Sequence, residues 1–312
     1  MDPISHALIG AGVAALSGQP FAWDNPIYIG SILGSMAPDL DIIMQTKGHL
    51  TYLKHHRGIS HSLPVLTGIA LVISGVLYFA FPGVHFWSLF GWTLAGTLSH
   101  GIFDLLNSYG ARLLWPFVKR RLTINSIIVS DPIILGSFIF TFWHNIYNQN
   151  FSGWAFAVSA VYVFLRWRGK CDVLNMVQQQ LGGERNEIMV FPAMYRLFSW
   201  NFVLERENDV VIGSVPFGKP TIVVKEILDK RQHPAIDTAE DSELGEVFRD
   251  FTPHYHVSHQ WLNDCQIVQF KDLRYHAKRG FMHTGTAILD QEGVLLEQTF
   301  EPYNAKKSIK IA

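Results

Sequence analysis

The feature that most constrains this chain is the uneven distribution of its charged residues. The chain has 25 Lys and Arg and 26 Asp and Glu, yet only 13 of these lie in residues 1–165, where the only acids are six aspartates. An apolar half with few ionisable residues is typical of a membrane domain, whereas a charged half is typical of a water-soluble one. The sequence therefore predicts a helical transmembrane domain over residues 1–170 and a strand-rich α+β cytoplasmic domain over residues 171–312.

About six apolar segments divide the first domain. Four are strong candidates for membrane spans because each approaches the roughly 20 residues that cross a bilayer; they are Leu63–Phe81, Phe86–Leu106, Ile127–Trp143 and Trp154–Trp167. Two earlier segments, Ile4–Ser17 and Ile27–Met44, are shorter and richer in glycine. They form either two short spans, which we favour, or a re-entrant pair.

The basic residues between these segments predict the orientation of the chain. If the segments alternate in direction, all three basic clusters fall on one side of the membrane; they are Lys47 to Arg57, Arg112 to Arg121, and Arg166 to Lys170. The turns on the other side contain no Lys or Arg. By the positive-inside rule, we expect a multi-pass protein of the bacterial cytoplasmic membrane with its second half in the cytoplasm.

The second half alternates short β-branched and aromatic runs with Gly and Pro, a pattern typical of strands. Residues 241–251 are the best helix candidate, and Phe198, Trp200 and Phe202 are interpreted as core residues. The formal net charge is −1, so no basic surface indicates a nucleic-acid partner.

The ionisable residues of the apolar half gather at one end of the predicted spans. With alternating spans, five separate segments bring these side chains to the cytoplasmic end: His6, Asp39, Asp41, His56, His61, His100, Asp104 and Asp131. His100 and Asp104 are four residues apart, so one helical face presents an imidazole and a carboxylate together. Asp39 and Asp41 follow Pro38, where a helix tends to break.

Such a set of ligands predicts metal binding. Aspartates in an apolar site would be costly without a cation, and a mixture of Asp and His suits Zn²⁺, or Mn²⁺ as the second choice, with two or more ions conceivable. Two residues keep alternative roles: Asp131 precedes Pro132 and is either a ligand or a helix N-cap, and Asp41 is either a ligand or a general base.

These motifs resemble the bacterial membrane-bound metal-dependent hydrolase family typified by YdjM. The matching elements cover roughly the first 135 residues and are Ser5-His6, Pro38-Asp39-Leu40-Asp41, His56-Arg57-Gly58-Ile59-Ser60-His61-Ser62, Ser99-His100 with Asp104, and Asp131-Pro132. The family pattern retains His56 rather than His55. The resemblance implies a hydrolase whose ligand pattern is similar to that of zinc-dependent phospholipases C, and the longer form with a C-terminal domain is similar to the YfhP-type proteins.

The predicted reaction is hydrolysis of a phosphoester by a metal-activated water. A site at headgroup depth favours a membrane phospholipid or a lipid-linked phosphate as the substrate. We expect Arg57 to hold a phosphate oxygen beside the ligands, and Arg120 or Arg121 to do so from the adjacent loop.

Two other functions fit parts of the pattern. A transporter is disfavoured because the polar residues lie at one end of the spans, whereas transporter sites lie near the middle of the bilayer. A regulatory or scaffold protein stays open; its membrane half would hold a structural metal, and its C-terminal domain would bind a cytoplasmic protein partner.

Overall fold

The computed structural model describes residues 1–47, 57–147, 153–194, 196–218, 221–252, 254–277, 280–302 and 308–311. The chain forms two compact units, Met1–Arg168 and Gly169–Ala312. The first unit is helical and the second is strand-rich with two main sheets, so the predicted order of fold classes is confirmed.

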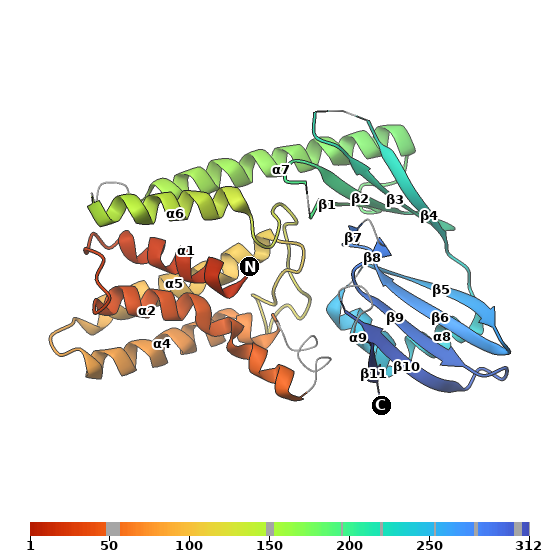
Figure 1. The fold of residues 1–312 in the computed structure, drawn as a ribbon, viewed down its shortest axis with the longest axis horizontal. Coiled ribbons are helices and arrows are strands. Elements are labelled where there is room, and N and C mark those ends of the chain that lie inside the picture. Colours follow the sequence, from red (N-terminus) through yellow and green to blue (C-terminus); the bar gives the residue numbers. More distant parts are fainter. Residues whose placement is uncertain are drawn as a thin grey trace. The chain divides into compact units, whose positions relative to one another are not determined.

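The first unit is built from helices (Figure 1). They are α1 (Pro3–Ala15), α2 (Pro26–Met36), the 3₁₀ segments η1 (Ala37–Lys47) and η2 (Ile59–His61), α4 (Leu63–Ala80), α5 (Phe86–Leu106), α6 (Pro132–Tyr147) and the start of α7 (Trp154–Leu181). A long segment without helix, residues 107–131, joins α5 to α6. Asp2 and Asn25 cap α1 and α2 with their side chains, and each of these helices has a proline in its first turn.

Small residues allow α2 to pack closely against α1 and α5. A Cβ placed on Gly96 of α5 would lie 2.4 Å from the carbonyl oxygen of Ser31 on α2, and one on Gly10 of α1 would lie 2.8 Å from the same oxygen. The Ser31 hydroxyl donates to the Gly10 carbonyl at 2.7 Å. Helices that approach this closely are typical of membrane bundles, where small residues and hydroxyls replace the hydrophobic driving force.

The first unit keeps many polar side chains inside and many large apolar ones outside. Ser31, Thr93 and Thr97 are fully buried, whereas Phe79 of α4 and Trp143 of α6 are 85% and 64% exposed. Among the described helices, α4 alone combines the length and hydropathy needed to cross a bilayer.

By this criterion of length and hydropathy, the predicted number of four strong membrane spans is too high. The helix α5 is long enough but carries His100 and Asp104 in its last two turns, α6 has 16 residues, and α7 becomes polar from Arg166 onward. The two early segments also differ from the favoured pair of spans. With 13 and 11 residues, α1 and α2 are about 20 and 17 Å long, short of the roughly 30 Å hydrocarbon core.

The second unit contains two antiparallel sheets and a short hairpin. The four-stranded sheet has the order β1 (Ile188–Pro192), β2 (Trp200–Glu205), β3 (Asp209–Val215) and β4 (Val223–Asp229). The five-stranded sheet has the order β11 (Ile309–Ile311), β10 (Leu295–Glu301), β9 (Thr284–Leu289), β6 (Cys265–Asp272) and β5 (Tyr255–Leu262). The hairpin pairs β7 (His276–Ala277) with β8 (Gly280–Phe281).

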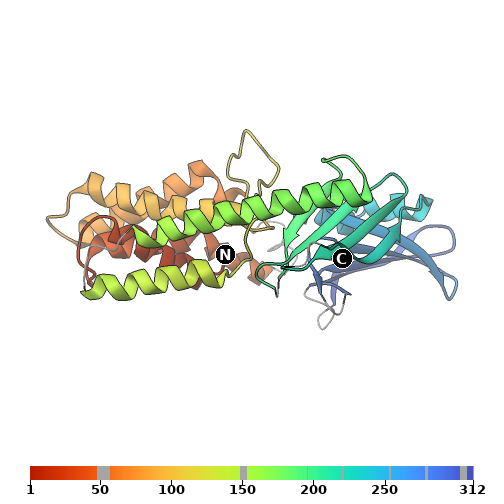
Figure 2. The same ribbon diagram turned by 90° about the horizontal axis from the view of Figure 1, so that it is seen from above.

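Helices cover these sheets. The C-terminal half of α7 places Val173 and Val177 against Trp200 and Phe202 of the four-stranded sheet. The helices α8 (Pro234–Glu240) and α9 (Glu243–Phe251) lie beside the five-stranded sheet. Phe248 of α9 contacts the rings of Phe270 and Phe300 in this sheet. The predicted helix over 241–251 corresponds to α9. Figures 1 and 2 show α7 as one unbroken helix.

Candidate metal centre

Four buried side chains of the first unit converge on one point. Asp39, His61, His100 and Asp104 each offer one ligand atom, and these atoms all lie within 4.8 Å of one another. The two Nε2 atoms of His61 and His100 are 2.9 Å apart. Each lies 3.5 to 3.7 Å from Asp39 Oδ1 and from Asp104 Oδ2.

Local structure explains how three separate segments reach this point. His100 and Asp104 are one helical turn apart on the buried face of α5. The helix α2 ends at Met36, and the 3₁₀ backbone that follows brings Asp39 to the cluster. His61 belongs to the 3₁₀ turn η2, directly before α4 begins at Leu63.

The hydrogen bonds of His100 leave its Nε2 atom as a lone-pair donor. Its Nδ1 atom lies 2.6 Å from the carbonyl oxygen of Ser35, which can only accept, so Nδ1 carries the proton. The Nε2 lone pair then faces the cluster. A histidine held by a backbone carbonyl in this way is typical of metal ligands.

The same reasoning applies to His61. The Ser60 hydroxyl donates to Asp41 Oδ2 at 2.9 Å and therefore accepts from the His61 Nδ1–H group, also at 2.9 Å. The Nε2 lone pair of His61 thus faces that of His100 across 2.9 Å, an arrangement that requires a cation or a proton between them.

Asp39 strengthens the case for a cation. Its Oδ1 atom is buried and accepts no hydrogen bond from the part of the chain that the structure describes. Tetrahedral zinc with bonds near 2.1 Å separates its ligand atoms by about 3.4 Å. The imidazole–carboxylate distances of 3.5 to 3.7 Å are close to this value, and the 2.9 Å between the two Nε2 atoms is shorter. The donor set therefore fits a divalent ion such as Zn²⁺.

Three further groups surround Asp104. Arg57 Nε lies 3.1 Å from Asp104 Oδ2, and the Met1 amino group contacts Asp104 Oδ1. His6 Nε2 lies 3.4 Å from the same Oδ1 atom, and its ring stacks on His100 with centroids 3.8 Å apart. Asp104 is thus held in place by groups from the start of the chain and from Arg57.

Arg57 is itself fixed by several contacts. One of its NH groups donates to Asn107 Oδ1 at 2.9 Å and another to the Met1 carbonyl at 3.4 Å, and its side chain is 4% exposed. Its φ of 58° lies in the left-handed region that non-glycine residues seldom adopt.

The predicted site residues therefore divide into groups. The structure brings Asp39, His61, His100 and Asp104 together, and His6 contacts Asp104 and His100 at the edge of this cluster. Asp41 lies behind His61, with Oδ2 3.8 Å from Nδ1. Asp131 is not brought to this cluster: it accepts from the Ile133 N–H at 3.1 Å and the Tyr162 hydroxyl at 2.9 Å, which is the N-cap alternative. Arg120 and Arg121 lie in the segment that joins α5 to α6; Arg120 is exposed and Arg121 is half-buried. His56 lies outside the described residues.

Sequence reasoning did not identify Ser35, Ser60 or Asn107 as supporting residues. The sequence could have indicated Ser60, because this residue lies within the motif from His56 to Ser62 that also contains His61. For Ser35 the acting group is a backbone carbonyl, and no side-chain pattern marks such a group.

Comparisons with known proteins match both parts of the chain. The profile of the YdjM inner membrane protein family matches residues 1–171, and the YfhP C-terminal alpha/beta plait domain matches residues 234–310. The protein YfhP of Bacillus subtilis (strain 168) is 25% identical over 290 residues, which cover 89% of this chain and 88% of that protein. No solved structure matches.

The four converging residues all lie within the part of the chain that the first profile covers. That profile extends over more than half of the chain, and the long apolar helix α4 agrees with a membrane location. The protein belongs to the YdjM inner membrane protein family and carries a YfhP-type C-terminal domain.

Proposed function

We propose that this protein is a membrane-bound metal-dependent hydrolase. Its substrate is a phosphoester of a phospholipid or a lipid-linked phosphate at the cytoplasmic face, and its ion is Zn²⁺, with Mn²⁺ as the second choice. The observation that carries the proposal is the pair of imidazole lone pairs facing each other beside the unbonded Oδ1 atom of Asp39.

The four converging residues would hold the ion. A divalent cation in this position would supply the Lewis acid that activates water for attack on the phosphoester. Asp39 is 8% exposed whereas the other three are fully buried, so water and substrate approach from the side of Asp39.

The neighbouring residues act by positioning these ligands. Asp41 acts on His61 through the Ser60 hydroxyl, which favours a positioning role over the predicted roles of ligand and general base. Arg57 is committed to Asp104 and Asn107, so we assign it to positioning Asp104 rather than to binding phosphate. Phosphate recognition then falls to Arg120 and Arg121.

Metal content and lipid hydrolysis of the purified full-length protein test this proposal. We expect a stoichiometric divalent ion, and release of a phosphorylated headgroup or inorganic phosphate from a panel of anionic lipids with Zn²⁺ or Mn²⁺. Asp39→Asn and His100→Gln should each lower metal occupancy, and turnover by at least about a hundredfold.

His85→Gln is the matched control, because His85 is an exposed histidine at the other end of the helix that carries His100. It should leave metal content and turnover unchanged. Purified protein without metal, or turnover unaffected by Asp39→Asn, would refute the proposal.

The burial of the cluster favours one alternative, a structural metal in a membrane-anchored regulatory protein. His61, His100 and Asp104 are fully buried, and structural zinc sites are closed in this way. This alternative predicts stoichiometric metal, loss of thermal stability on chelation and no lipid hydrolysis, together with a cytoplasmic partner bound by the C-terminal domain.

A further inference from the structure

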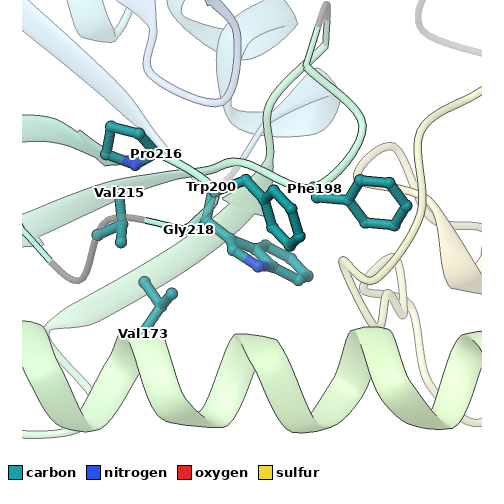
Figure 3. A pocket seen from close by; sticks show the side chains of 7 residues that line it. Val173, Phe198, Trp200, Val215, Pro216 and Gly218 are labelled. Carbon is teal, nitrogen blue, oxygen red and sulfur yellow. The ribbon is translucent and has the colours of Figure 1, made fainter.

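The second unit contains an open pocket of about 320 Å³ beside α7 (Figure 3). Its walls are apolar: Val173 comes from α7, Phe198 and Trp200 from the start of β2, and Val215, Pro216 and Phe217 from the end of β3. The residues that line it lie between the regions matched by the two family profiles or, like Val173, just after the first. All of the lining residues belong to the second unit, whereas the four converging residues belong to the first.

Two aromatic rings at this pocket face solvent. Phe198 is 43% exposed and Phe217 is 71% exposed, and their ring centroids are 5.1 Å apart. The backbone N–H of Phe217 donates to Ser199 Oγ at 3.2 Å, which ties the two loops together. The sequence predicts all three aromatic residues of this stretch to be core. Trp200 and Phe202 are buried, which confirms the prediction for them, whereas Phe198 is exposed.

The pocket lies close to the point on α7 where the apolar surface of that helix ends. Its exposed residues are apolar as far as Phe164, Leu165 and Trp167, and from Arg168 onward they are polar. Gly169 lies two residues beyond Trp167, and a Cβ placed on it would be 3.4 Å from Nε1 of Trp200. With a rise of about 1.5 Å per residue, Trp200 packs on α7 within one turn of the point where the apolar surface ends.

Basic side chains accompany the exposed rings. Arg196 is exposed two residues before Phe198. Lys225 of β4 is exposed, and its ammonium group donates to Asn201 Oδ1 on β2 at 3.1 Å. Exposed aromatics beside cations are typical of surfaces that bind anionic membranes.

We propose that this face of the second unit docks on the surface of an anionic lipid bilayer. Phe198 and Phe217 insert at the boundary between headgroups and acyl chains, and Arg196 and Lys225 contact lipid phosphates. The proposal concerns how the second unit is held at the membrane and does not depend on hydrolysis or on a metal.

A fluorescent label on the full-length protein tests this docking. In a background of Cys171→Ser and Cys265→Ser, Phe217→Cys carries an environment-sensitive dye, and the protein is placed in nanodiscs of phosphatidylcholine and phosphatidylglycerol that contain an acyl-chain spin label. We expect the spin label to quench the dye at least about twofold. Trp261→Cys is the matched control, because Trp261 is 55% exposed on the same unit and does not line the pocket; its dye should stay unquenched.

Charge-removing variants test the second half of the proposal. Arg196→Gln with Lys225→Gln should weaken quenching of the Phe217→Cys dye, and high salt should do the same, while the thermal midpoint stays unchanged. Equal quenching at both labelled sites, or none at Phe217→Cys, would overturn the proposal. A third outcome would also overturn it. If the dye is shielded from aqueous iodide but is not quenched by the lipid spin label, and the particle contains two copies of the chain, then a second copy occupies this face.

Discussion

At the scale of single residues, the candidate site depends on groups behind the ligands. Ser60 accepts from His61 and donates to Asp41, so the Asp41 charge keeps the His61 Nε2 lone pair directed at the cluster. We predict that Asp41→Asn weakens metal binding about 10- to 100-fold, as loss of an outer partner of a ligating histidine does. Metal competition with a fluorescent chelator measures this. Asp24→Asn, at an exposed aspartate of the same unit, is the control, and equal affinities in both variants would contradict the role of Asp41.

At the scale of elements, the contact between α2 and α5 positions the ligands. Gly96 of α5 lies against the Ser31 carbonyl, whereas a Cβ placed on Gly91 of the same helix meets no atom of another described segment within 4 Å. Gly96→Ala should therefore destabilise the first unit by about 1–3 kcal/mol. Gly91→Ala should stabilise it by about 0.4–1 kcal/mol, because alanine restricts the unfolded chain. Thermal unfolding in detergent measures both. Because His100 is one turn from Gly96, Gly96→Ala should also lower metal occupancy. If both variants changed the unfolding temperature in the same direction, that result would contradict this packing.

At the scale of the whole molecule, the second unit should lose stability in acid. Burial is the main cause that lowers the pKa of His256 on β5 to about 4, and the nearby Lys271 and Lys230 lower it further. Since the ordinary value is about 6.5, the unfolded chain binds the proton first, and stability present above pH 6.5 is lost as pH falls toward 4. His256→Gln should remove up to about 3 kcal/mol of this pH dependence from the second unit. Calorimetric unfolding of the full chain between pH 7 and 4 tests this, and an unchanged pH slope in the variant would contradict it.

Much of this organisation was predictable from local pattern. The loss of apolar character after Trp167, the strand pattern of the second half and the i, i+4 spacing of His100 and Asp104 depend on neighbours in the sequence. The helical lengths were harder to predict. The apolar segment Ile27–Met44 contains a break after Met36, because the Ala37-Pro38 sequence disfavours a continuous helix, and the 3₁₀ backbone that results carries Asp39 to the site.

The sequence by itself determined the two fold classes, their order and the kinds of ligand in the cluster, because hydropathy, periodicity and residue type are local properties. Only the tertiary structure decided which atoms meet. It separated Asp39, His61, His100 and Asp104 from Asp131, which caps α6, and from Asp41, which lies behind His61. The physical reason is that one hydrogen bond, such as that between His100 and the Ser35 carbonyl, depends on helix packing across 65 residues of chain. The six aspartates of the apolar half are alike in the sequence, and their contacts alone assign them different roles.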